Sequence, residues 1–329
     1  MANNQEQFDA YHDLINATST RRITLRNNRK ALRNRIKSYF KNNHEDEIQP
    51  SFYWQGSYAM FTILNPIKDE DKLGAYDLDD GVYFVGESED DKKDLEWYHN
   101  EVLTAVKDHT DQGADDNDPC ITVNYADGHH VDLPIYFQIK DERPQLAHRA
   151  TPWIGSDPRE LKEWFTEKCK EKTKLRRMVR FLKGWADYVN NSKDFKMPTG
   201  CILSMLADKY YRDNSDGRED IMMRDMLTNM YEALSEEDGF KCERPTYPYD
   251  DLFEGYNEIR KKKFLAELMA FKEDAERAVN ETNPRKACLK WQKHFGDRFS
   301  CSTAKDEDED EDAKTNEKSG FLKNNSRFA

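Results

Sequence analysis

The sequence predicts an α+β protein in which a lobe with a mixed β-sheet is followed by a helical lobe. Apolar runs with the two-residue alternation of β-strands are concentrated in the first half of the chain. From Asp157 onward the apolar residues follow helical spacing, and Asp157 with Pro158 is a typical helix start. We therefore expect a core with N-terminal helices over residues 1–150, a helical domain over 151–301 and a disordered acidic and polar tail over 302–329.

The individual elements follow from local patterns. Residues 6–41 lack proline and glycine and carry apolar residues at helical spacing, so they predict two helices. The segment Ala126-Asp127-Gly128 is a typical hairpin turn between two strands. In full, we expect strands over 51–54, 76–85, 121–125 and 130–139, further helices over 57–64 and 96–107, and a polar loop over 111–119.

The composition of the 329-residue chain predicts an acidic, cytoplasmic protein. The net charge is -13, which argues against a long nucleic acid as partner, because phosphate backbones are bound by surplus lysine and arginine. We recognise no secretion signal and no run that would span a membrane, so we expect no membrane contact. The six cysteines lack a Cys-x-x-Cys motif, which predicts reduced thiols rather than a disulfide frame or a zinc site.

Three aspartates in apolar runs carry the strongest functional signal. Asp77 and Asp79 are two residues apart in a predicted strand, so their side chains share one face while Leu78 enters the core. Asp132 lies in a second apolar strand and is expected to complete a nest of three carboxylates. Buried carboxylates require a cation, so the pattern predicts two Mg²⁺ ions, or Mn²⁺, arranged for phosphoryl transfer. Asp80 points to the opposite side and is left out of the site.

The segment Gln55-Gly56-Ser57 is the first candidate for nucleotide binding. It joins a predicted strand to a predicted helix, whose free N–H groups and partial positive charge attract phosphate. Glycine lets a triphosphate approach the backbone closely. The alternative, that Ser57 only caps its helix, is compatible with this interpretation.

A basic stretch that ends at Lys183 supplies the second candidate. Such stretches are usually solvated helix faces, but apolar residues such as Phe181 give this helix a buried side. We therefore expect Lys183 to reach the cleft between the lobes and to hold a β- or γ-phosphate. Thr199, at the start of the next helix, is expected to contact the same phosphates, whereas His129 and His130 are expected in a turn and not as ligands.

Taken together, these motifs resemble the cGAS/DncV-like nucleotidyltransferases, in particular the bacterial cyclic GMP-AMP synthases of the DncV type. The resemblance implies a polymerase-β-like core, a helical lobe, and a nucleotide cleft between them. The matching stretches follow the family's order and cover residues 52–57, 77–83, 130–136, 153–158 and 177–185.

The resemblance also implies an activity. Family members join nucleoside triphosphates such as ATP and GTP with Mg²⁺, release pyrophosphate and close a ring, which here predicts a cyclic, cGAMP-like dinucleotide. In the family these products are second messengers that activate an effector in anti-phage defence, which implies the bacterial cytosol. By motif position, Asp77 and Asp79 hold both metals, Asp132 binds the catalytic metal, and Ser57 and Lys183 hold the triphosphate.

Two features of the sequence depart from the family pattern or allow more than one interpretation. The family's Pro-Ser-Ser contact is Pro198-Thr199-Gly200 here, so the relatives' hydroxyl falls on Gly200, which has none. The end of the chain at Ala329 fits a tail that a ubiquitin-like conjugation enzyme joins to targets, and it fits a plain solubilising tail equally well. A nucleotidyltransferase that modifies another acceptor, or a catalytically silent nucleotide-binding regulator, are the alternative functions.

Overall fold

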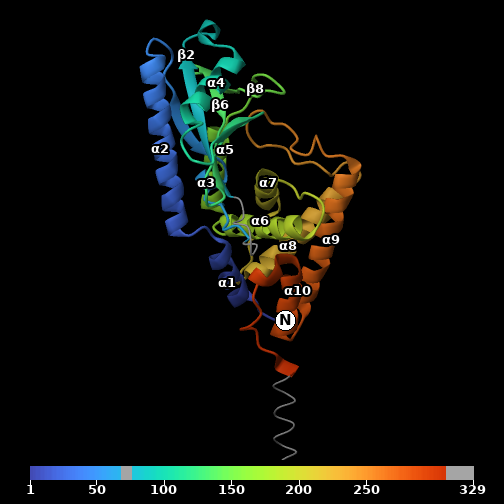
Figure 1. Cartoon of the computed structure of the whole chain (residues 1–329). Coiled ribbons are helices and arrows are strands. Elements are labelled where there is room, and N and C mark those ends of the chain that lie inside the picture. The colour runs from blue at the N-terminus through green and yellow to red at the C-terminus, as the bar shows by residue number, and fades with distance from the viewer. Residues whose placement is uncertain (68–75, 309–329) are drawn as a thin grey trace, which may run out of the picture.

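The computed structural model describes residues 1–67 and 76–308 and confirms an α+β fold with a sheet lobe and a helical lobe (Figure 1). The predicted conjugation site at Ala329 lies outside the described residues. In the described ranges the eight strands are β1 (Ser51–Gln55), β2 (Tyr76–Gly86), β3 (Ala114–Asn117), β4 (Cys120–Asn124), β5 (His129–Leu133), β6 (Ile135–Ile139), β7 (Gln145–Leu146) and β8 (Ile154–Gly155).

Strand β2 is the centre of the sheet. It pairs with β1 in antiparallel register, and with β5 and β6 in parallel register. β5 and β6 lie end to end alongside β2 and are separated by Pro134. The residue pairs Asp79–Asp132 and Val82–Ile135 show this, because the difference in residue number between the paired strands is the same before and after the proline. The strand predicted over 130–139 is confirmed with this interruption, since proline has no N–H to donate. β3 corrects the loop predicted over 111–119.

Helices α2 (Ser19–Asn43) and α4 (Leu95–Val106) complete the sheet lobe, and α2 runs along one side of the sheet in Figure 1. The buried stripe of α2 includes Leu32 and Phe40, and it packs into the same apolar core as Phe84 of β2. A short helix, α3 (Gly56–Ala59), and a 3-10 turn over Glu89–Asp91 complete this part. α3 ends well before Leu64, the predicted end of its helix, because the chain turns at Phe61, whose φ is 59°.

The helical lobe surrounds α6, whose buried face includes Phe181 and Trp185, as predicted. Phe8 of α1 packs edge-on against Phe181 and Trp291, with ring centroids 5.2 and 5.0 Å apart. α1 thus joins the helical core although the sequence places it before the sheet. No described helix is long and apolar enough to cross a membrane. The helices are α1 (Gln5–Ile15), α5 (Pro158–Glu171), α6 (Leu175–Ser192), α7 (Gly200–Tyr210), α8 (Glu219–Ser235), α9 (Glu258–Asn280) and α10 (Pro284–Phe295).

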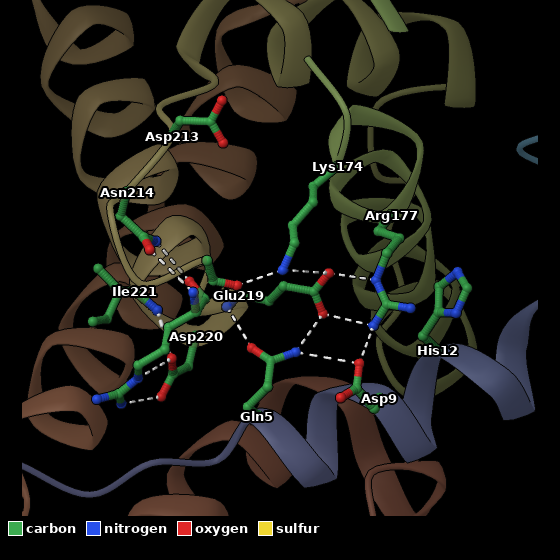
Figure 2. A network of polar contacts seen from close by, with 12 residues as sticks. Gln5, Asp9, His12, Lys174, Arg177, Asp213, Asn214, Glu219, Asp220 and Ile221 are labelled. Atoms are coloured by element: carbon green, nitrogen blue, oxygen red, sulfur yellow. Dashed lines mark hydrogen bonds and ion pairs between the residues drawn. The ribbon is translucent and has the colours of Figure 1, made fainter. Parts of the chain in front are cut away.

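Buried charge fixes α1 to the helical lobe, as Figure 2 shows. The carboxylate of Glu219, at the start of α8, is fully buried and accepts hydrogen bonds from Arg177 of α6 (2.6 Å) and Gln5 of α1 (3.0 Å). The backbone N–H of Glu219 donates in return to the Gln5 side chain at 2.7 Å. One carboxylate therefore joins three helices that are far apart in the sequence.

The C-terminal segment corrects two predictions. Cys288 of α10 and Cys301 form a disulfide, because the 3-10 turn Gly296–Arg298 brings the chain back onto α10. The prediction of reduced thiols was therefore wrong for this pair, whose separation of 13 residues carries no recognisable motif. Beyond it, Thr303 accepts a hydrogen bond from Gln7 at 3.0 Å, and the Lys305 carbonyl accepts one from the backbone of α10. The tail predicted from residue 302 thus begins too early.

Candidate active site

The three predicted aspartates converge at the edge between β2 and β5. Asp77 and Asp79 lie on β2, and Asp79 is the direct parallel neighbour of Asp132 on β5. One carboxylate oxygen from each of the three lies within 4.8 Å of the others. Leu78, between the first two, is completely buried, as the alternation of a strand requires. The alternation of side chains along β2 sets Asp77 and Asp79 on one face, and the register between β2 and β5 brings Asp132 beside them.

The cluster fits divalent cations. Burial and the negative charges of Asp77 and Asp132 raise the pKa of Asp79 to about 8, so that in the absence of a cation the ionised form of this carboxyl group is disfavoured. A bound cation would offset the repulsion among the three carboxylates, and carboxylate oxygens are ligands that Mg²⁺ and Mn²⁺ prefer. The residues present therefore match the predicted cofactor.

Two neighbours that the sequence analysis missed orient Asp132. Thr122 lies opposite Asp132 in the β4–β5 register and donates a hydrogen bond to it at 2.7 Å. His130 lies two residues before Asp132, on the same face of β5, with its Nδ1 3.2 Å from the carboxylate. Both histidines thus belong to a strand and not to the predicted turn. The two-residue alternation of strands would have revealed the contact of His130.

Asp80 points away from the cluster, as predicted. It is completely buried on the other face of β2 and accepts a hydrogen bond from Nε of Arg33 at 2.6 Å. Arg33 belongs to α2, so this ion pair connects the long helix to the strand that carries the aspartates. Asp80 therefore has a structural partner, whereas Asp77 and Asp79 face the cleft.

Gly56 has a structural role in addition to the predicted one. Its φ is 65°, and a Cβ atom at this position would overlap the carboxylate of Asp79. Glycine is required here because the backbone turns in the left-handed region directly against the carboxylate of Asp79. Gln55 lies next to Asp79 in the β1–β2 register and donates a hydrogen bond to the hydroxyl of Tyr136 at 3.0 Å.

Two cavities meet at this cluster, with volumes of about 360 and 480 Å³. Both are lined by Ser57, Asp77, Lys183 and Gly200, which lie at their junction. Thr199 lines the first cavity, while Gln55, Gly56 and Asp79 line the second. Each predicted site residue therefore borders a cavity or, like Asp132, belongs to the carboxylate cluster. Arg244 also lines the second cavity.

Lys183 reaches the cleft from α6, as predicted. Its Nζ donates to the carbonyl of Thr62 at 3.0 Å, and burial lowers its pKa against the opposing effect of Asp77 and Asp79. A Cβ atom at Gly200 would lie 3.0 Å from Cε of Lys183, so the residue that lacks the relatives' hydroxyl leaves space for this lysine. Thr199 accepts a hydrogen bond from the backbone of Ile202 at 3.5 Å, which makes it the N-cap of α7.

Comparison with known proteins agrees with this arrangement. Residues 50–136 match the family described as cyclic GMP-AMP synthase DncV-like, nucleotidyltransferase domain. A cyclic GMP-AMP synthase from Escherichia albertii is 26% identical over 171 residues, which cover 50% of this chain and 38% of that relative. The alignment thus spans less than half of the relative's length.

Solved structures with the same fold include two of the Vibrio cholerae DncV cyclic AMP-GMP synthase. The complex with the linear intermediate 5' pppA(3',5')pG has a TM-score of 0.73 at 18% identity, covering 89% of this chain and 97% of that one. The structure described as a prokaryotic cGAS homolog has a TM-score of 0.76 at 17% identity, covering 91% and 97%. At these identities the likeness shows that the fold is shared.

Proposed function

We propose that this chain, a member of the cGAS/DncV-like nucleotidyltransferases, joins nucleoside triphosphates into a cyclic oligonucleotide, specifically a cGAMP-like cyclic dinucleotide made from ATP and GTP. One observation carries the proposal: the aspartate cluster lies where two cavities meet, so a nucleotide on each side would face the same carboxylates. The complex of the similar V. cholerae enzyme with a linear dinucleotide intermediate supports it.

The chain's own residues would bind the donor triphosphate. Ser57, at the start of α3, and Lys183 border both cavities, so they can contact the β- and γ-phosphates while the α-phosphate faces the aspartates. Thr199 lies further along the first cavity and adds its hydroxyl. Divalent cations, when bound by the three aspartates, would neutralise charge on the transferring phosphoryl group and favour ionisation of the attacking hydroxyl.

The acceptor nucleotide would occupy the second cavity. Arg244 lines this cavity, and its Nε donates to Asp250 at 2.6 Å, which fixes the orientation of the guanidinium plane. Asp132, oriented by the hydrogen bond from Thr122, would interact with the acceptor ribose hydroxyl. After the first transfer the linear product would turn around, so that its own triphosphate becomes the donor at the same carboxylates.

The test is incubation of the purified chain with the four ribonucleoside triphosphates and Mg²⁺ or Mn²⁺, followed by mass spectrometry of nuclease-treated products. We expect a cyclic product from the native chain and none from Asp77→Asn. Asp111→Asn, an exposed aspartate before β3, is the control for the change in charge and should retain activity. A product that appears only with an added acceptor would favour the alternative transferase, and tight binding without pyrophosphate release would favour the silent regulator.

The proposal extends to the cell. The product would act in the bacterial cytosol as a second messenger that activates an effector in anti-phage defence. A ubiquitin-like conjugation enzyme would join the chain to targets through Ala329. Co-expression of such an enzyme with the full chain and with a chain lacking Ala329 tests this part, and a conjugate that persists without Ala329 contradicts it.

A further inference from the structure

We infer that a basic groove beside the active site binds the pyrophosphate that leaves during each transfer. We call it the outer groove; its volume is about 310 Å³, and it is lined by Phe195, Lys196, Asn257, Ile259, Arg260 and Lys263. Lys196 and Arg260 also line the first catalytic cavity. The outer groove therefore continues the cavity proposed to hold the donor triphosphate, and the inference rests on that proposed function.

The cations of the outer groove are available to an anion. Among the described residues, Lys196, Arg260 and Lys263 have no carboxylate within ion-pair distance, whereas neighbouring lysines do: Lys193 pairs with Glu267, and Lys261 with Glu258. The net charge of the chain is -13, so three cations around one groove that have no carboxylate partner within residues 1–67 and 76–308 are an unusual concentration of positive charge. Their combined positive potential would attract a multivalent anion.

Arg260 is held in place by contacts that leave its charge unneutralised. Its guanidinium carbon lies 3.8 Å from the centre of the Tyr256 ring, and its Nε is buried without a hydrogen-bond partner among the described residues. Asp187, which also lines the first cavity, is paired with Arg298 at 3.1 Å. An anion entering here would therefore meet fixed guanidinium donors, which match phosphate oxygens well.

The position of Lys196 connects the outer groove to the proposed phosphate contacts. It lies in the loop between α6 and α7, three residues before Thr199, which borders the same cavity as Lys183. Lys183 and Thr199 line the first cavity, Lys196 and Arg260 line both hollows, and Lys263 lines the outer groove. A group with two linked phosphates, released in the first cavity, is the anion that these cations fit.

The proposed reaction releases pyrophosphate, which must leave the site before the ring can close. In each transfer the acceptor oxygen bonds to the α-phosphorus, the bond from that phosphorus to the bridging oxygen breaks, pyrophosphate leaves with the electron pair, and the hydroxyl proton passes to solvent. Ring closure uses the same site again, so the first pyrophosphate must leave before the triphosphate of the linear product can enter. The outer groove would draw it away from the aspartates.

Calorimetry of the full chain with inorganic pyrophosphate and Mg²⁺ tests this inference without requiring turnover. We expect Lys196→Ala and Lys263→Ala each to weaken binding about 3- to 10-fold at low ionic strength, with a smaller effect in high salt. Lys262→Ala is the matched control, because this exposed neighbour in α9 lines neither cavity and removes the same charge. Unchanged affinity in both groove variants, or an equal loss in the control, would overturn the inference.

Kinetics separates this inference from the proposed function. With nucleoside triphosphates, the groove variants should accumulate more linear intermediate than the control variant, because pyrophosphate would stay longer at the aspartates. If no cyclic product forms from any nucleotide but pyrophosphate binding depends on Lys196 and Lys263, the function is wrong and the groove stands. If cyclic product forms and the variants match the native chain in both assays, the groove is wrong and the function stands.

Discussion

Replacement of Asp79 with asparagine should stabilise the metal-free protein. In the unfolded chain this carboxyl group has its ordinary pKa of 3.8, whereas burial beside Asp77 and Asp132 raises the folded pKa to about 8. Between these values the group must take up a proton to fold, so the destabilising effect is absent below the unfolded pKa and grows as pH rises. Asparagine has nearly the same shape and no charge, so it removes this effect.

The magnitude follows from the difference between the two pKa values. At pH 7 the solution is about three pH units above the ordinary pKa of Asp79 and still below the folded one. At roughly 1.4 kcal/mol for each unit, the uptake of this proton on folding costs about 4 kcal/mol, which is an upper limit because the Asp79 side chain is only partly buried. We expect Asp79→Asn to raise the free energy of unfolding of the metal-free protein by a substantial part of this amount at pH 7, and by almost nothing near pH 4.

Urea denaturation in EDTA, followed by circular dichroism at several pH values, measures this difference. Mg²⁺ should reverse the order of stability, because a cation that binds only the folded state stabilises the native chain more than the variant. Asp80→Asn is the control: it removes a carboxylate that pairs with Arg33, and it should destabilise the chain by about 3 kcal/mol or more. If Asp79→Asn in EDTA is less stable than the native chain at pH 7, or if its effect does not change with pH, the reasoning fails.

Three further changes test other parts of the structure. Gly56→Ala should lower Mg²⁺ affinity in calorimetry and cost about 1–2 kcal/mol of stability, because the new methyl group meets Asp79 in a left-handed backbone; unchanged Mg²⁺ binding would contradict this. Glu219→Gln should reduce the free energy of unfolding in urea by about 3 kcal/mol, since Arg177 loses its buried counter-charge, and a change below about 1 kcal/mol would refute the importance of this network. Thr122→Val should lower kcat several-fold with little change in thermal stability, because Asp132 loses a hydrogen bond that orients it; a rate equal to that of the native enzyme would argue against this role.

Much of the site was predictable because its signals are local. Alternation along one strand sets Asp77 and Asp79 on a common face and Asp80 on the other, and the apolar stripe of α6 directs Lys183 into the cleft. The length of a helix is less local: α3 ends early although its sequence lacks a breaker before Asn65. The hydrogen bond from Thr122 to Asp132 was missed because it depends on the register between two strands.

The sequence by itself determined the order of lobes, the central strand and the common face of Asp77 and Asp79, because these depend on contacts between residues close in the chain. Only the tertiary structure decided that Asp132 lies beside Asp79, that α1 packs in the helical core, and that Cys288 bonds to Cys301. The same holds for the cations of the outer groove, which come from the loop before α7 and from α9. Strand register and helix packing depend on the burial of many side chains that are far apart in the sequence, so no short sequence motif predicts them.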